Sequence, residues 1–207
     1  MITVIDYGMG NLKSVGNALK YLNIDYKISE NIKDIKEATG IILPGVGGFP
    51  NAIERLRERE LDLAIKKRCE DNVPLLGICL GMQLLFNKSY EGGAYKGLSL
   101  IEGEVLKLQG NVKIPQIGWN SLEFNELFNY KSNPLLKGIN KEDFVYYVHS
   151  FYGKVKDNKD LIAYSSYGEN KVAGIVQRGN VFGTQFHPEK SGEIGLRIIK
   201  NFGELIK

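Results

Sequence analysis

The sequence has few cysteines, histidines and tryptophans. Its 207 residues include two cysteines, Cys69 and Cys79, two histidines and one tryptophan. Two cysteines are too few for a disulfide framework, and such scarcity is typical of the reducing cytoplasm, where we expect the protein to reside. No group of cysteines, histidines and acids has the spacing of metal ligands, so we expect no bound metal.

Long hydrophobic runs and a strong excess of one charge are also lacking. No apolar stretch is long enough to span a bilayer, and residues 1–6 lack the basic start of a signal peptide. Lysine and arginine total 27 against 24 acidic residues, and this net charge of +3 is too small and too scattered to suggest nucleic acid. We expect neither a membrane nor a nucleic acid as partner.

Signatures of nucleotide cofactors are missing as well. The chain contains no P-loop, and Gly8 and Gly10 lack the third glycine of a dinucleotide-binding loop. The sequence therefore predicts that no cofactor takes part in its chemistry.

The most informative stretch present is Gly77-Ile78-Cys79-Leu80-Gly81. An apolar run, 73–76, leads into it, and residues 81–86 continue at helical spacing. This order predicts a strand, an abrupt turn and a helix with Cys79 at the apex, which is the thiol form of a nucleophile elbow. The N-terminal amides of the helix would favour the thiolate. A buried structural cysteine is the alternative interpretation.

The first half of the chain alternates between short apolar runs and helical periods. We predict strands at 2–6, 25–29 and 40–43, a helix at 12–22, and one long or two short helices over 50–68. Strand–helix–strand order with apolar strands favours a parallel sheet with right-handed crossovers.

From residue 100 onward short strands replace the helical period. A polar loop at 87–93 precedes strands predicted at 105–108, 120–124, 144–149, 161–167, 172–178 and 181–185, and a helix at 193–206 closes the chain. The predicted class is α/β, an open mixed, mostly parallel sheet flanked by helices, with additional antiparallel strands in the C-terminal half. No repeat or linker interrupts the sequence, so we expect residues 1–207 to form a single domain.

A cysteine nucleophile needs a base and a group that orients the base. His187 lies just past an apolar strand, and the carboxylate of Glu189, two residues on, can hold its tautomer. His149 ends another predicted strand and has no acid beside it. The spacing favours a Cys79–His187–Glu189 hydrolase or transferase that acts on an acyl carbon, whereas a core histidine is the alternative for either position.

A glycine-rich loop follows the third predicted strand. Pro44-Gly45-Val46-Gly47 leaves backbone N–H groups unshielded at the carboxyl end of that strand, where ligands bind in open α/β sheets. These amides suit an oxyanion hole for an intermediate formed at Cys79. A plain turn is the alternative.

Two motifs together, Gly77–Gln83 and Phe186–Glu189, resemble the class I (triad) glutamine amidotransferases. Further motifs resemble the glutaminase subunits of imidazole glycerol phosphate synthase. They are residues 5–15, Pro44–Gly47, Gly118–Asn120, Tyr147–Ser150 and His187–Ser191. These motifs cover nearly the whole chain, and no triad position departs from the family pattern.

The resemblance implies a role for each matched residue. Cys79 would attack the side-chain amide of glutamine to give a γ-glutamyl thioester and ammonia, with His187 moving the proton and Glu189 orienting His187. The residues implied to hold glutamine are Gln83, Glu91, Ser150 and Phe151. The oxyanion hole would comprise Gly45, Val46, Gly47 and Leu80, with an amide that is expected to flip before it donates.

The resemblance also implies a partner. The family passes its ammonia to a (β/α)8-barrel cyclase subunit, in a heterodimer that makes imidazole glycerol phosphate and AICAR in histidine biosynthesis. Its glutaminase is nearly silent until the cyclase binds its nucleotide substrate. Our candidates for the interface are Asn11, Gln116 and Trp119, with a core position as the alternative for Trp119.

Three other functions remain open at this point. The chain could serve another synthase, in anthranilate, aminodeoxychorismate or pyridoxal phosphate synthesis. It could be a stand-alone γ-glutamyl hydrolase that needs no partner. A catalytically dead binding module is the third, and the intact residues Cys79, His187 and Glu189 argue against it.

Overall fold

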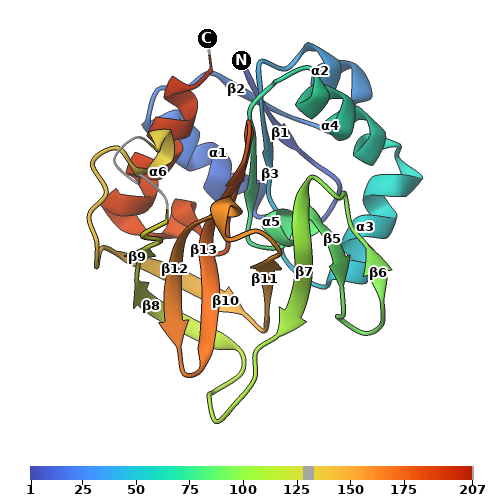
Figure 1. Ribbon diagram of the computed structural model, residues 1–207. Coiled ribbons are helices and arrows are strands. Elements are labelled where there is room, and N and C mark those ends of the chain that lie inside the picture. The colour runs from blue at the N-terminus through green and yellow to red at the C-terminus, as the bar shows by residue number, and fades with distance from the viewer. Residues whose placement is uncertain (128–132, 207) are drawn as a thin grey trace.

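Eight strands form one sheet at the centre of the computed structural model, which describes residues 1–127 and 133–206 (Figure 1). Their order is β2-β1-β3-β4-β14-β13-β12-β9. The strands are β1 Ile2–Ile5, β2 Tyr26–Ser29, β3 Gly40–Leu43, β4 Leu75–Ile78, β9 Glu123–Phe124, β12 Leu161–Tyr167, β13 Asn170–Arg178 and β14 Val181–Thr184. The run from β2 to β14 is parallel and the remaining strands are antiparallel, which confirms the predicted fold class.

Helices cover both faces of this sheet. They are α1 Leu12–Tyr21, α2 Ile32–Glu37, α3 Phe49–Glu58, α4 Leu61–Glu70, α5 Leu80–Leu84 and α6 Gly192–Glu204, with short 3-10 turns at Pro134–Leu136, Asn158–Asp160 and Pro188–Lys190. One hydrophobic core packs α1 and α6 against the sheet, and a second packs α2, α3, α4 and α5 against the opposite face. Because both faces are covered, β1, β3, β4 and β14 are buried along their whole length.

Alternation along single strands divides the residues between these two cores. In β3, Ile41 and Leu43 belong to one core and Ile42 to the other. Successive side chains of a strand point to opposite faces, so a continuous apolar run can serve both cores at once. This explains why the central strands read as unbroken hydrophobic segments.

The helices predicted over 50–68 are two, α3 and α4. Glu60 separates them with a left-handed backbone, φ 54°. A left-handed residue cannot continue a right-handed helix, so the chain turns at this point.

Two smaller sheets extend the fold beyond the central one. β11 (Phe151–Val155), β7 (Ile101–Lys107), β5 (Phe86–Ser89) and β6 (Tyr95–Lys96) form one, and β8 (Gln116–Ser121) pairs with β10 (Phe144–His149) in the other. The strand predicted at 120–124 is split between β8 and β9, which belong to different sheets.

The polar loop predicted at 87–93 was wrong in its first part, because β5 runs through residue 89. Asn87 and Lys88 are poor strand formers, but β5 pairs with β7, and the Asn87 side chain accepts a hydrogen bond from the Gly103 amide. Pairing with a distant strand therefore overrides local preference here.

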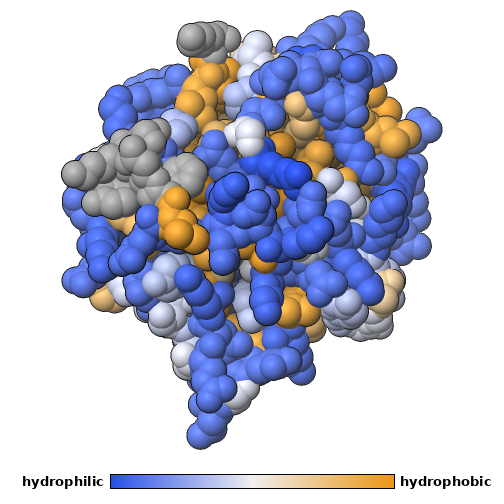
Figure 2. Space-filling view, viewed as in Figure 1, coloured by the Kyte–Doolittle hydropathy of each residue, from blue (hydrophilic) through white to orange (hydrophobic). Residues whose placement is uncertain are grey.

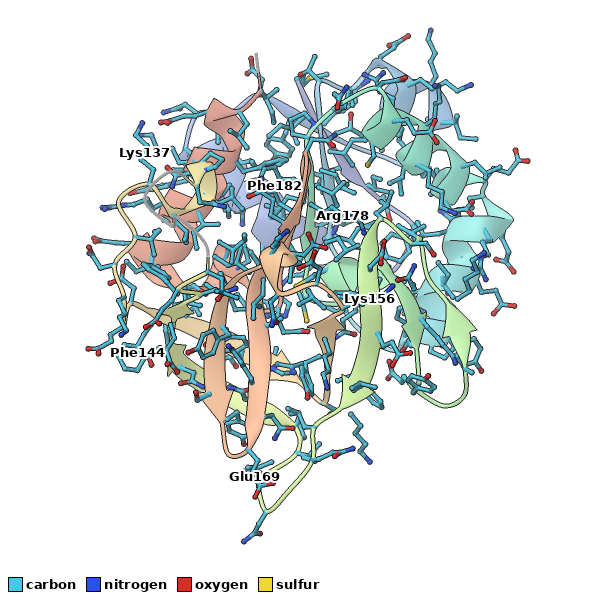
Figure 3. The ribbon with its side chains drawn as sticks, viewed as in Figure 1. Lys137, Phe144, Lys156, Glu169, Arg178 and Phe182 are labelled. Carbon is cyan, nitrogen blue, oxygen red and sulfur yellow. The ribbon has the colours of Figure 1, made fainter. Side chains whose placement is uncertain are left out.

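Ion pairs link the four-stranded sheet that contains β7 to the central sheet. Glu102 of β7 accepts from Arg178 of β13 at 3.1 Å and from Lys156, just after β11, at 3.2 Å. Figure 3 labels Arg178 and Lys156 close together at this junction. All three side chains are well exposed, so the pairs contribute little to stability and mainly fix the relative position of the sheets.

The molecular surface is largely hydrophilic on the face in Figure 2, with small hydrophobic areas between charged side chains. Within residues 1–127 and 133–206, no helix combines the length and hydrophobicity needed to cross a membrane.

Gly81 supplies a stability test of the fold. A Cβ at this position would clash with the Leu43 carbonyl oxygen, because α5 starts directly against the end of β3. We expect Gly81→Ala to lower the free energy of unfolding in urea by about 3 kcal/mol. A Cβ on Gly48 would meet no atom closer than 3.6 Å, so Gly48→Ala should cost less than about 1 kcal/mol. Equal unfolding midpoints for the two variants would contradict this packing.

Candidate active site

Three neighbouring parallel strands end at one edge of the central sheet and deliver the candidate residues there. Leu43 of β3 and Gly183 of β14 both pair with Gly77 of β4. The glycine-rich loop, the elbow cysteine and the histidine segment therefore follow these strands side by side. This is the edge at which open α/β sheets bind ligands.

Cys79 has the backbone strain of a nucleophile elbow. Its φ is 53° and its ψ is −109°, a conformation that non-glycine residues rarely adopt. The Cys79 amide donates to the Thr184 carbonyl at 2.7 Å, which ties the turn to β14. A Cβ on Gly77 would lie 2.7 Å from the Gly81 carbonyl oxygen, so the turn requires glycine at this position.

His187 and Glu189 form a buried hydrogen-bonded pair. His187 Nδ1 lies 2.8 Å from Glu189 Oε1, and the side chains are 2% and 1% exposed. Burial lowers the pKa of His187, but hydrogen bonds and charges from Cys79 and Glu189 outweigh it and raise that pKa to about 10. The raised pKa favours the protonated form of His187 beside Cys79, and this form can give a proton to a leaving group.

His149 lines the same cavity as Cys79 and His187, but its hydrogen-bond partner differs from that of His187. Its Nδ1 is 3.0 Å from the Phe151 carbonyl oxygen, so Nδ1 carries the proton. Burial is the main cause that lowers the pKa of His149 to about 4, despite that hydrogen bond and with a further contribution from the charge of His187. His149 is therefore neutral at physiological pH and has no carboxylate partner among the described residues.

One amide of the glycine-rich loop is turned away from the cysteine. The Val46 amide donates to the Met9 carbonyl at 3.2 Å, so it is not available to an oxyanion. The Tyr7 hydroxyl donates to the Pro44 carbonyl at 2.9 Å and anchors the start of the loop. The Val46 N–H belongs to the Gly45–Val46 peptide, and Gly45, which has no Cβ, leaves that peptide freer to rotate. The expected flip thus has a defined starting point, while the oxyanion role stays a prediction.

A cavity of about 360 Å³ opens beside the cysteine. Its lining includes Cys79 and His187, together with Val46, Gly47, Leu80, Gln83, Glu91, Ser150 and Phe151 from the predicted set. Gly45 lies behind the lining, where a Cβ would approach the Tyr7 hydroxyl and the Gly81 amide. The structure thus brings most of the predicted substrate and oxyanion residues together, from five segments of the chain.

Two of the predicted glutamine-binding side chains are also tied to the protein. Glu91 Oε2 accepts from the Phe49 amide at 2.9 Å at the start of α3. Gln83 is 4% exposed and donates from Nε2 to the Phe151 carbonyl at 2.7 Å. A direct contact between glutamine and Gln83 would therefore use its Oε1 or require this bond to change.

The candidate interface residues lie in different environments. Trp119 is 55% exposed in strand β8, and its ring centroid lies 5.9 Å from that of Tyr146. Phe144, at the start of β10 and labelled in Figure 3, is 56% exposed on the same face of this two-stranded sheet. Gln116 is only 3% exposed, which argues against direct contact with a partner. Asn11 caps α1 through its side chain.

Sequence reasoning missed Gln185, which contacts the nucleophile. Gln185 is fully buried, and its Nε2 lies 3.7 Å from Cys79 Sγ. The signal was its position two residues before His187, since alternate residues of an extended segment share one side.

The arrangement as a whole defines a class of protein. A strained cysteine at a strand–helix turn, beside a buried histidine–carboxylate pair, is the constellation of thiol-dependent acyl transfer and hydrolysis. The same fold is found in solved structures of other proteins. A solved structure of a glutamine amidotransferase superimposes with TM-score 0.75 at 19% identity, covering 100% of this chain and 99% of that one. The structure of PurLQS from Thermotoga maritima superimposes with TM-score 0.73 at 20% identity, covering 100% of this chain and 98% of that one.

Sequence comparison identifies the family. The family model "Glutamine amidotransferase class-I" matches residues 3–205. The chain therefore belongs to the class I glutamine amidotransferases. Curated relatives named "Imidazole glycerol phosphate synthase subunit HisH" include one from Caldanaerobacter subterraneus subsp. tengcongensis, 50% identical over 100% of this chain and 99% of that protein. Another, from Oceanobacillus iheyensis, is 42% identical over the full length of both.

The two histidines allow a direct test of the site's electrostatics. In an NMR titration of the ring protons, His187 should titrate well above and His149 well below the ordinary range. Glu189→Gln removes one of the two groups that raise the pKa of His187, so that pKa should fall by at least about one unit. Glu193→Gln, at an exposed position, is the matched control and should change neither value. An unaltered His187 titration in Glu189→Gln would contradict the pairing.

Substitution of each histidine separates the base from its neighbour. We expect His187→Asn to lower glutamine turnover about 10³-fold or more, because triad members act as a unit. His149→Asn should cost less than about tenfold, since His149 faces no carboxylate. Steady-state glutamate release by folded variants, under conditions in which the unmodified chain turns over glutamine, measures both losses. A reversed order of the two losses would assign the base to His149.

Proposed function

We propose that this chain is the glutaminase subunit of an imidazole glycerol phosphate synthase. It hydrolyses glutamine to glutamate and ammonia, and the ammonia is used by a partner subunit in histidine biosynthesis. Residues 1–207 act as one glutaminase domain, in the cytoplasm. The observation that carries the proposal is the elbow cysteine beside the buried His187–Glu189 pair, at the mouth of a pocket with one carboxylate. The curated relatives named as subunits of imidazole glycerol phosphate synthase, which match over the full length of this chain, support the choice of synthase.

The first half of the reaction forms a thioester. Cys79 Sγ attacks the side-chain amide carbon of glutamine, and the electron pair moves to the carbonyl oxygen. The Leu80 amide at the start of α5 and a rotated Val46 amide stabilise this oxyanion. As the oxyanion collapses, the C–N bond breaks and the nitrogen takes the His187 proton, so neutral ammonia leaves. Because its pKa is raised, His187 carries the proton that this step needs.

The second half returns the enzyme to its starting state. Neutral His187 takes a proton from water, whose oxygen attacks the thioester carbon. The C–S bond then breaks, its electron pair returns to Sγ, and glutamate leaves. Glu189 holds the His187 ring in one tautomer and stabilises its positive charge in both halves.

The pocket suits the amino-acid end of glutamine. Glu91 is the carboxylate of the lining, and it can pair with the α-ammonium group of the substrate. The backbone around Ser150 and Phe151 lines the same cavity. Glu91 also accepts a hydrogen bond from the Phe49 amide. Substrate binding is therefore coupled to the start of α3, which follows the glycine-rich loop.

The proposed partner is a (β/α)8-barrel cyclase subunit in a heterodimer. Its docking surface includes Trp119, whose exposed ring and the neighbouring exposed side chains of Ile117 and Phe144 can anchor an interface. Asn11 is kept as a candidate contact, and Gln116 would act only indirectly because it is buried. The Val46–Met9 hydrogen bond fits a glutaminase that is silent until a partner changes the loop.

Glutamine hydrolysis by the purified chain, alone and with the cyclase subunit plus its nucleotide substrate, tests the proposal. Near silence alone and strong activation by partner and nucleotide together are expected. High activity of the chain alone would instead indicate a stand-alone γ-glutamyl hydrolase. Activation by another synthase, but not by the cyclase, would assign the chain to that pathway.

Glu91 provides a test of substrate binding. Glu91→Gln keeps an oxygen that can accept from the Phe49 amide but removes the negative charge. We expect the KM for glutamine to rise about tenfold, with kcat little changed, because a charge-assisted contact with the α-ammonium is lost. Glu104→Gln, at an exposed position of β7, is the control and should leave the KM unaltered. An unchanged KM in Glu91→Gln would exclude contact between Glu91 and glutamine.

A further inference from the structure

Gln185 lies against the nucleophile and has no role in the mechanism above. It follows β14 directly, next to the elbow, and its side chain is fully buried. Its Nε2 lies 3.7 Å from Cys79 Sγ, which is hydrogen-bonding distance for a sulfur acceptor. A buried amide beside a reacting atom is in a position to affect its chemistry.

The orientation of this amide follows from its other contacts. Gln83 Nε2 donates to the Phe151 carbonyl at 2.7 Å and to Gln185 Oε1 at 3.1 Å. A backbone carbonyl can only accept, so the Gln83 amide must present its nitrogen to Phe151 and to Gln185. The Gln185 oxygen then faces Gln83, and its N–H group faces the sulfur. The hydrogen-bond chain therefore fixes a donor, not an acceptor, at Sγ.

The remaining surroundings of the sulfur are less favourable to negative charge. Sγ lies 3.9 Å from the Val148 carbonyl oxygen, which can accept from a thiol but opposes a thiolate. The titratable groups that face Cys79 or share its cavity are His187, Tyr7, His149 and Glu91. Of these only His187 is a base with a raised pKa, so it is the group that can present a positive charge to the sulfur. Gln185 thus supplies an uncharged donor that does not change with pH.

We infer that Gln185 is a further catalytic residue, whose side-chain N–H donates a hydrogen bond to Cys79 Sγ and stabilises the thiolate. Hydrogen bonding to the charged form of a group favours that form, and burial strengthens the effect. Gln185 acts at two points of the proposed reaction. It stabilises the thiolate before attack, and it receives the returning charge when the C–S bond of the thioester breaks and the electron pair goes back to Sγ.

The reactivity of Cys79 tests this inference without glutamine or a partner. The second point above rests on the proposed function, but the thiolate contact does not, so a failed glutaminase assay would leave this readout intact. The rate of carbamidomethylation by iodoacetamide is measured against pH, and the label is assigned to Cys79 by peptide mass spectrometry. Cys69 is buried, and burial raises the pKa of its thiol to about 12, so it reacts slowly.

Gln185→Met removes the donor while keeping a side chain of similar length. We expect the midpoint of the pH profile to rise by about one unit, so that Cys79 reacts about tenfold more slowly below the midpoint. The matched control is Gln177→Met in β13, whose amide donates to the Gly179 carbonyl far from the sulfur, and its profile should equal that of the unmodified chain. An unchanged profile in folded Gln185→Met overturns the inference.

A second variant keeps the test decisive if Gln185→Met does not fold. Gln185→Glu preserves the size of the side chain and an acceptor for Gln83, but places a carboxylate instead of an N–H group beside the sulfur. Cys79 should then react several-fold more slowly at neutral pH than in the unmodified chain. Equal or faster reaction in this variant would also overturn the inference. Circular dichroism establishes that each variant is folded.

Discussion

The site depends on the in-register pairing of three parallel strands. β3, β4 and β14 end at the same edge, with Gly77 of β4 between Leu43 and Gly183. The next residues along each strand are the start of the glycine-rich loop, the nucleophile turn and the histidine segment. A shift of one residue would turn the side chains of a strand to the opposite face, so the double-sided core also fixes the active-site geometry. Stability and chemistry are thus determined by the same register.

Around this frame, strain and buried polar contacts are concentrated at the cysteine. Cys79 has a positive φ, and the close approach of β3 to α5 admits only glycine at position 81. His187 and Glu189 are almost completely buried, and a mutual hydrogen bond through Glu189 Oε1 offsets part of the cost of removing them from water. The Gln83–Gln185 pair adds a second buried polar contact at the sulfur. The site is therefore largely preorganised, apart from the glycine-rich loop, whose Val46 amide is directed away.

The sequence allowed prediction of features encoded by local pattern. Apolar runs and helical periods gave the central strands and the main helices, and the elbow and the His187–Glu189 spacing could be read directly from neighbouring residues. Features that depend on pairing between distant segments could not be found this way. The β5 strand contains poor strand formers, and the burial of Gln116 follows from its pairing with His149 across β8 and β10. The hydrogen bond from Val46 to Met9 and the Gln185 contact likewise join segments that the sequence keeps far apart.

The most direct test of the account is to identify the covalent intermediate. The chain, together with the proposed synthase partner, is quenched in acid during glutamine turnover, and its peptides are analysed by mass spectrometry. A γ-glutamyl adduct is expected on the peptide that contains Cys79, and it should be absent from a Cys79→Ala variant that remains folded. Sustained glutamine hydrolysis by the Cys79→Ala variant, or an adduct on another residue, would contradict it.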